Sequence, residues 1–228
     1  MLFQQLFEAC SSTYTYIVGD EQTREAIIID PVLETLDRDL KLIDELGLKL
    51  LYSLETHIHA DHVTSSGRIA DVTGAQIVVG ENAHVGCRAM KIADGETLNF
   101  GKYTLRAIAT PGHTPCSMSY YVEDRVFTGD TLLIRGNGRT DFQGGCPEKL
   151  YRNVTTKLFG LPEETLVYPG HDYKGFTSST IGCEKKYNAR LGQQRTLNEF
   201  VEIMKNLALP PPKKIDIAVP ANLQCGRV

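Results

Sequence analysis

Residues 56–62 read THIHADH and gather three histidines and one aspartate on a short stretch of chain. The alternate positions of His57, His59 and Asp61 allow their side chains to converge, and His62 follows directly. Imidazole and carboxylate groups together suit zinc, iron or manganese, and they argue against a thiolate-only site or a calcium site. The stretch therefore predicts a transition-metal site.

Three shorter motifs follow in the order TPGHT, FTGD and YPGHD, and they add His113, Asp130 and His171. A glycine stands beside each of these residues, and we expect it to let the backbone approach the ion closely. A lone histidine is usually an ordinary core or surface residue, but that explanation would have to hold at every one of these positions together. His84, within ENAHVGC, does not belong to a motif of this kind and is interpreted as an ordinary residue.

The motifs fall where predicted strands end. β-Branched and aromatic runs predict strands or hairpins at 14–20, 25–30, 48–56, 75–80, 96–110, 117–123 and 125–130, and a further segment follows at 165–172. Apolar residues at three- or four-residue spacing predict helices at 31–47, after 62, at 147–159 and at 196–207. Residues 210–214 are expected to form a stiff connector, and 215–221 a final extended segment. Strands interspersed with amphipathic helices predict a layered α/β fold with helices on the outer faces.

Length and composition place the chain among ordinary globular proteins. Its 228 residues suit one domain spanning 1–228, with 42% hydrophobic and 23% charged residues. The net charge of −4 comes without any basic cluster, so no nucleic acid is expected as a partner. The N-terminus has no signal-peptide pattern, and no apolar run approaches the roughly 20 residues of a membrane span. We expect no membrane association and a cytoplasmic protein; a homodimer is compatible with the sequence.

Six cysteines are scattered along the chain without a C-x-x-C pair. A chain of this length does not need disulfide bonds for stability, so all six are predicted to be reduced thiols.

The motifs THIHADH, TPGHT, FTGD and YPGHD resemble those of the metallo-β-lactamase superfamily. That resemblance implies an αββα sandwich of two mixed sheets flanked by helices, with metal bound at the strand ends. Its hydrolytic members bind two metals, which would put His57, His59 and His113 on one ion and Asp61, His62 and His171 on the other, with Asp130 bridging. All seven residues are present.

Longer stretches, among them FTGDTLLIRGNGRTDFQGG (127–145) and KIDIAVPANLQCG (214–226), resemble persulfide dioxygenases of the ETHE1-like kind. This resemblance implies one Fe(II) per chain, held by His57, His113 and Asp130, and oxidation of glutathione persulfide by O₂ to sulfite and glutathione. The residues that would then orient the ligands and bound water are His59, Asp61, His62 and His171. Asn137 stands where the animal enzymes are expected to carry cysteine, so no thiol chemistry is assigned there.

Arg139 and Tyr173 are candidates for binding the substrate, because they lie in GRTDF and HDY close to candidate ligands. A guanidinium suits the carboxylates of glutathione. An ion pair between Arg139 and Asp141 would explain the arginine equally well.

The main alternative is a glyoxalase II-like thioester hydrolase with a dinuclear metal site, in which a metal-bound hydroxide attacks a glutathione thioester. Those enzymes usually carry a long helical C-terminal domain, and residues 172–228 are too few for it. A non-catalytic metal-binding protein is the least favoured reading, because it would tolerate loss of ligands and none is missing.

Overall fold

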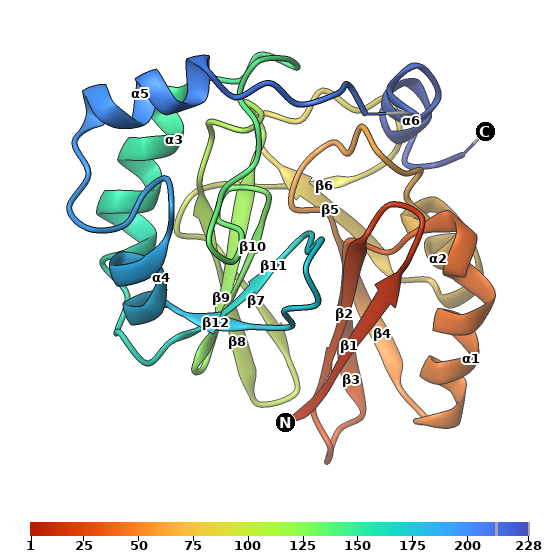
Figure 1. Cartoon of the computed structure of the whole chain (residues 1–228). Helices are drawn as coiled ribbons and strands as arrows, with labels where there is room; N and C mark the ends of the chain where they lie inside the picture. The colour runs from red at the N-terminus through yellow and green to blue at the C-terminus, as the bar shows by residue number, and fades with distance from the viewer. Residues whose placement is uncertain (213, 228) are drawn as a thin grey trace.

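The computed structural model describes residues 1–212 and 214–227 and consists of two facing β-sheets with helices outside them (Figure 1). The first sheet has the order β1-β2-β3-β4-β5-β6. Its strands are β1 (Leu2–Glu8), β2 (Thr13–Gly19), β3 (Glu25–Ile29), β4 (Lys49–Leu54), β5 (Gln76–Gly80) and β6 (Met90–Ile92). The first three strands pair antiparallel and the remaining pairs are parallel, so the sheet is mixed.

The second sheet has the order β12-β11-β10-β9-β8-β7. Its strands are β7 (Thr97–Phe100), β8 (Tyr103–Ala109), β9 (Met118–Val122), β10 (Arg125–Gly129), β11 (Leu166–Pro169) and β12 (Ser179–Thr180). Only the pairing of β10 with β11 is parallel. This sheet is therefore also mixed, as expected.

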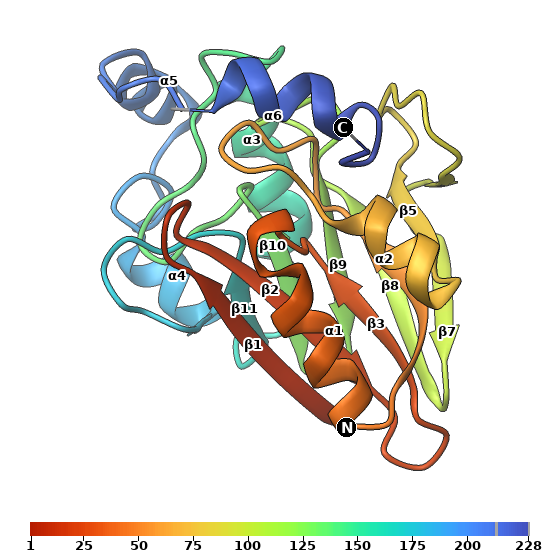
Figure 2. The same cartoon turned by 90° about the vertical axis from the view of Figure 1, so that its right-hand side faces the viewer.

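Helices cover the outer face of each sheet (Figures 1 and 2). The first sheet is flanked by η1 (Leu33–Thr35), α1 (Leu36–Glu45) and α2 (Ser66–Thr73). The second is flanked by α3 (Pro147–Asn153), its π-helical continuation η2 (Val154–Leu158), α4 (Ile181–Tyr187) and α5 (Leu197–Lys205). A last helix, α6 (Ile215–Asn222), lies at the end of the sandwich where the metal motifs are found. The layers form the predicted αββα sandwich.

The central core lies between the two sheets. Ile27, Ile29 and Leu54 of the first sheet pack in one cluster with Leu105 and Phe127 of the second, and all five side chains are inaccessible to solvent. Burial of each such side chain contributes about 1.5–3 kcal/mol, which makes this layer the main source of stability. It fixes the strand ends from which the candidate metal ligands project.

The helix α1 forms as its apolar spacing predicts. Ile43 is buried against the first sheet together with Leu36 and Leu40. Gly47 follows the helix with a φ of +60°, a conformation that costs glycine little, and ends it as expected. The strands and helices predicted up to residue 207 are all found within a few residues of their expected bounds.

The prediction of an extended segment at 215–221 is wrong, because these residues form α6. The β-branched residues and Pro220 favour an extended chain, and an interior proline normally weakens a helix. Ala218, Ala221 and Asn222 are nevertheless buried on one helical face, and packing of this face against the body of the protein prevails. Residues 208–212 contain no helix or strand; Lys213, within the expected connector 210–214, lies outside the described residues.

The prediction of six reduced cysteines is also wrong. Cys87 and Cys225 form a disulfide across 138 positions of the sequence. No local spacing could have predicted this pair, since the fold alone brings the two residues together. The free cysteines are Cys10, Cys116, Cys146 and Cys183. Apart from α6, the longest elements that the sequence did not predict are β1 and α4.

No helix among the described residues is long and apolar enough to span a bilayer.

Candidate metal centre

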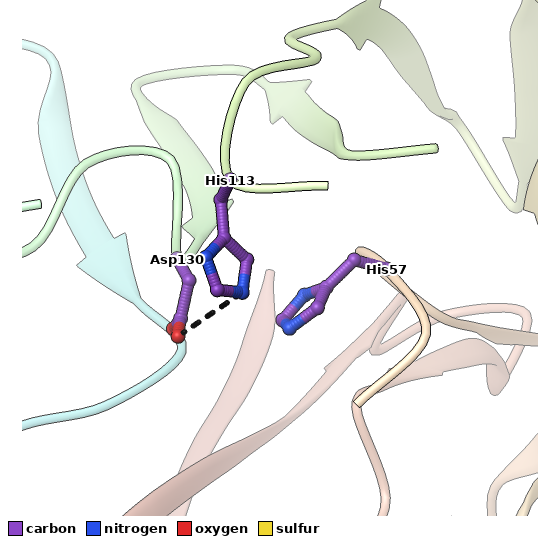
Figure 3. Close-up of side chains that lie close together, drawn as sticks. All are labelled: His57, His113 and Asp130. Atoms are coloured by element: carbon purple, nitrogen blue, oxygen red, sulfur yellow. Dashed lines mark ion pairs between the residues drawn. The ribbon is translucent and has the colours of Figure 1, made fainter. Parts of the chain in front are cut away.

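Three predicted ligands meet at one end of the sandwich, in the gap between the sheets (Figure 3). His57 lies on the loop after β4, His113 on the loop after β8, and Asp130 directly after β10. Each offers a ligand atom, and these atoms all lie within 4.8 Å of one another. The strand ends thus assemble two imidazoles and one carboxylate from distant parts of the sequence.

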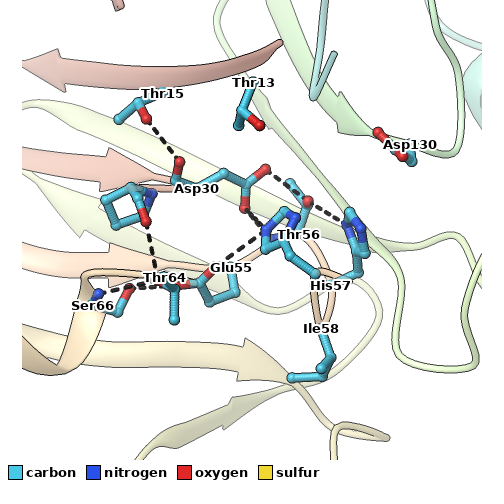
Figure 4. Close-up of polar contacts among 12 residues, drawn as sticks. Thr13, Thr15, Asp30, Glu55, Thr56, His57, Ile58, Thr64, Ser66 and Asp130 are labelled. Carbon is cyan, nitrogen blue, oxygen red and sulfur yellow. Dashed lines mark hydrogen bonds and ion pairs between the residues drawn. The ribbon is translucent and has the colours of Figure 1, made fainter. Parts of the chain in front are cut away.

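A chain of hydrogen bonds from Asp30 and Thr56 orients His57 (Figure 4). Asp30 accepts the Thr56 backbone N–H and the Thr56 hydroxyl, each at 2.7 Å. The hydroxyl has only one proton, so Thr56 Oγ1 accepts from His57 Nδ1 at 3.0 Å. This bond fixes the His57 tautomer, and the Nε2 lone pair is left for a metal.

His113 is oriented in the same way by a backbone carbonyl. Its Nδ1 donates to the carbonyl oxygen of Arg139 at 2.7 Å, which leaves Nε2 as the metal-facing atom. The rings of His57 and His113 stand edge to face with their centres 4.8 Å apart. His113 Nε2 lies 3.7 Å from Asp130 Oδ2.

The two oxygens of Asp130 have different surroundings. His171 Nδ1 donates to Oδ1 at 2.6 Å, while Oδ2 faces the two imidazoles. Burial alone would raise the pKa of Asp130, but the imidazoles of His171, His113 and His57 together outweigh burial, and the pKa lies below its ordinary value. One oxygen of an ionised carboxylate is therefore free for a metal.

His171 belongs to a second group of residues beside this triad. Its Nε2 donates to Asp61 Oδ2 at 2.9 Å, so both of its ring nitrogens are bound to carboxylates. The same Asp61 oxygen accepts from His62 Nδ1 at 2.9 Å, and Thr13 Oγ1 lies 3.1 Å from His171 Nε2. Burial opposes protonation of His171, yet Asp130 and Asp61 raise its pKa well above the ordinary value.

His59 is buried, and its ring centre lies 4.1 Å from that of His57. Its Nε2 lies 3.2 Å from Asp30 Oδ1 and 3.3 Å from Glu55 Oε2. Glu55 in turn accepts hydrogen bonds from the hydroxyls of Thr64 and Ser66. Of the three histidines in the THIHADH loop, His57 belongs to the triad. His59 and His62 are instead held by other carboxylates.

The glycines beside His113, Asp130 and His171 lie close to neighbouring residues. A side chain at Gly129 would overlap Thr56, one at Gly112 would overlap Leu150, and one at Gly170 would come within 2.9 Å of Asp130 Oδ1. These glycines allow close packing of neighbouring residues.

His84 lies exposed and apart from the site, as expected for an ordinary residue.

The triad fits a divalent transition metal. Burial lowers the pKa of His57 well below its ordinary value, which favours the neutral imidazole that a metal requires. Both histidines carry a partner on Nδ1, and the carboxylate supplies one negative charge. Two histidines and one carboxylate are the ligands of the facial triad in non-haem iron oxygenases.

A cavity of about 460 Å³ opens over the triad and is lined by His57, His113 and Asp130. Its volume lies in the range of small-molecule sites. Arg139 and Tyr173, the predicted substrate residues, both line it. Arg139 also forms a two-pronged ion pair with Asp141, both contacts 2.6 Å long, as the alternative interpretation expects.

Two further cations on the cavity wall have no acidic partner. No carboxylate of the described residues lies within ion-pair distance of Arg190 or Lys174. The Arg190 guanidinium donates to the carbonyl oxygen of Asn137 at 2.7 Å. Burial lowers the pKa of Arg190. Neither Arg190 nor the orienting pair Asp30 and Thr56 was predicted as functional, because no metal-ligand spacing marks them.

We expect Thr56→Val to weaken metal binding about tenfold, the usual scale for loss of a hydrogen bond to a metal ligand. Valine has the shape of threonine but leaves His57 Nδ1 without its acceptor. Thr56→Ser keeps the hydroxyl and serves as the matched control, with metal affinity measured by chelator competition. Equal affinities of the valine and serine variants would show that the Asp30–Thr56–His57 chain does not orient the ligand.

Comparison with known proteins agrees with this geometry. The family model of the metallo-β-lactamase superfamily matches residues 9–86 and 90–171, and the chain is therefore a member of that superfamily. The human protein named persulfide dioxygenase ETHE1, mitochondrial, is 50% identical over 99% of this chain and 89% of its own; the mouse protein of the same name matches equally well. The crystal structure of ETHE1 from Myxococcus xanthus covers the whole of both chains with 52% identity and a TM-score of 0.97. The chain belongs to the ETHE1 persulfide dioxygenase family.

Proposed function

We propose that this enzyme is a persulfide dioxygenase that oxidises glutathione persulfide with O₂ to sulfite and glutathione at a single Fe(II). The observation that carries the proposal is the compact triad of His57, His113 and Asp130 at the base of a cavity. These three residues would hold the iron and leave the positions that a substrate and O₂ need. Similarity to the ETHE1 proteins over nearly the full chain supports the same activity.

Similarity to the ETHE1 proteins, and not the arrangement of His171 and Asp61, supports one metal rather than two. In a dinuclear site both residues would be ligands of the second ion, together with His62. His171 Nδ1 lies 2.6 Å from Asp130 Oδ1 and its Nε2 lies 2.9 Å from Asp61 Oδ2, and His59, Asp61 and His62 offer ligand atoms within 4.8 Å of one another, so the geometry alone does not decide the number of metals. We assign His59, Asp61, His62 and His171 to the network that holds the ligands and bound water in place.

The stoichiometry can be tested with His62→Ala. We expect the variant to keep about one iron per chain and to lose activity ~10–100-fold, because Asp61 loses one of its partners. Metal content by mass spectrometry and O₂ uptake are measured together, with His84→Ala, on the exposed loop, as the control. A fall from two metals in the wild type to one in His62→Ala would support the dinuclear hydrolase.

The reaction consumes one persulfide, one O₂ and one water and releases glutathione, sulfite and two protons. Bound iron supplies the redox chemistry that activates O₂ towards the terminal sulfur. The protein positions this sulfur over the triad and holds the rest of the peptide on the cavity wall. His171 keeps Asp130 Oδ1 occupied, so that the carboxylate offers the metal its other oxygen.

The cations of the wall suit the two carboxylates of glutathione. Arg190 and Lys174 have no acidic partner among residues 1–212 and 214–227, and we propose them as carboxylate-binding residues alongside Arg139. Tyr173 is mostly exposed at the rim, where its ring stacks on His171 with centres 6.1 Å apart. Its phenol can contact the peptide without contacting the metal.

For Arg190→Ala we expect a KM for glutathione persulfide raised about tenfold or more, with kcat and iron content nearly unchanged. Loss of an unpaired guanidinium removes a charge-assisted hydrogen bond to substrate. Arg139→Ala should raise KM less, since Asp141 already competes for that side chain. Arg88→Ala, exposed and away from the cavity wall, is the control. An unchanged KM in Arg190→Ala would remove this residue from the substrate site.

A direct comparison of substrates separates the two candidate reactions. The dioxygenase consumes O₂ when given glutathione persulfide and leaves a glutathione thioester intact. A thioester hydrolase does the reverse. The comparisons do not favour the hydrolase, because similarity to the ETHE1 proteins extends over 99% of the chain.

Three broader proposals accompany the function. The core shared by both sheets supports one domain over 1–228, which predicts a single unfolding transition. A cytoplasmic location is a second proposal, which fractionation of cells tests. The edge strand β1 offers a surface for a homodimer, which sedimentation tests.

A further inference from the structure

The buried side chain of Asn222 joins the C-terminal helix α6 to the THIHADH loop. Its Nδ2 donates to the carbonyl oxygens of His59 and His62, each at 2.9 Å. Its Oδ1 accepts the backbone N–H of Thr64 at 2.8 Å. One carboxamide thus satisfies three backbone groups of the loop that carries His57, and only 3% of the residue is exposed.

The chemistry of these partners determines the orientation of the carboxamide. Carbonyl oxygens only accept and an amide N–H only donates, so the amide group can adopt one orientation alone. No residue of similar size offers two donors and one acceptor at these positions. Aspartate keeps the acceptor and loses both donors, whereas alanine loses all three contacts.

The rest of the C-terminal segment packs equally closely on the loop. Ala218 and Ala221 of α6 pack against Val63, and α6 lies beside the loop before α2 (Figure 2). Gly226 has a φ of +71°, and a side chain there would overlap the carbonyl oxygen of Thr64. The Gly67 N–H donates to Cys225 O at 2.9 Å. Both the C-terminal segment and the loop before α2 therefore contribute residues to this contact.

We propose that Asn222 is a positioning residue for the metal centre, which fixes the loop between His57 and Thr64 from α6. The side chain touches no candidate metal-ligating atom and acts only through the loop backbone. Without it, three buried backbone groups lose their partners and the loop must rearrange to recover them. His57 and the anchors Asp61 and His62 then move relative to His113 and Asp130.

The test compares metal binding and loop protection in four proteins: wild type, Asn222→Ala, Asn222→Asp and Ala218→Gly. Ala218→Gly weakens the same helix and its packing against Val63 but leaves the carboxamide in place, which makes it the control for every effect of α6 other than that of Asn222. The Fe(II) dissociation constant is measured anaerobically by chelator competition. Hydrogen exchange of residues 57–66 is measured on the metal-free proteins.

We expect both Asn222 variants to raise the dissociation constant about tenfold or more and to speed exchange over 57–66. Ala218→Gly should stay within about twofold of the wild type. Asn222→Asp decides the question if the alanine variant does not fold. Wild-type affinity in a folded Asn222 variant, or equal weakening by Ala218→Gly, overturns the proposal. The inference rests on the metal role of His57, and a wild-type protein without affinity for iron would instead overturn the proposed function.

Discussion

Asp130→Ala is expected to abolish iron binding. The substitution removes the only carboxylate of the triad, and with it the negative charge that offsets the divalent ion. It also deprives the buried His171 Nδ1 of its acceptor at 2.6 Å. Iron per chain, measured after anaerobic reconstitution and desalting, should fall to background, and persulfide-dependent O₂ uptake should fall with it.

The matched control for this variant is Asp124→Ala. Asp124 is an exposed aspartate that pairs with Arg125 at the start of the same strand, β10. It should retain full iron content and activity, because an exposed ion pair contributes little. An Asp130→Ala protein that keeps one iron per chain would exclude Asp130 as a ligand.

The second large effect is expected from Gly138→Ala. A methyl group at this position would lie 2.5 Å from Asp130 O, 2.8 Å from Asp130 Cβ and 2.9 Å from His113 Nδ1. It would therefore push apart two candidate ligands that come from different strands. Overpacking of this kind costs about 1–3 kcal/mol, which corresponds to roughly a 5–150-fold loss of iron affinity if the strain falls on the bound state.

Gly136→Ala, two residues earlier in the same loop, is the control for Gly138→Ala. Nothing lies within 4 Å of the methyl group that it would add. Neither glycine has a positive φ, so the two substitutions differ in local packing and not in backbone strain. Equal iron affinities of the two variants, measured by chelator competition, would mean that the loop absorbs the methyl group at Gly138 and that the close packing there is not needed for metal binding.

The sequence predicts the strand ends, and a group of metal ligands placed after them, because both depend on local patterns. The choice of His57, His113 and Asp130 as the triad is implied only by the resemblance to persulfide dioxygenases. THIHADH and the motifs around His113 and Asp130 follow buried strands, and strands that meet in one sandwich bring their ends together. The same reasoning predicts α1 with its terminal Gly47. These features depend on hydrophobic spacing, turn chemistry and metal-ligand spacing, all of which can be read along the chain.

The residues that orient the ligands are different, because their roles arise from contacts between distant parts of the chain. Asp30 reaches Thr56 across 26 positions, and Asn222 reaches Thr64 across 158. Arg190 becomes a candidate for substrate binding only when the cavity around it is visible. The helical conformation of 215–222 is decided by packing against the metal loop and not by the local preference of Pro220 and its β-branched neighbours.

The central claim, a single iron that oxidises a persulfide, is tested most directly on one preparation of the wild-type protein. The protein is purified without oxygen, its metal content is determined, and O₂ consumption is followed after addition of glutathione persulfide. The account predicts about one iron per chain and one O₂ consumed for each sulfite formed. Two zinc ions per chain, with no O₂ consumption and rapid hydrolysis of a glutathione thioester, would contradict it.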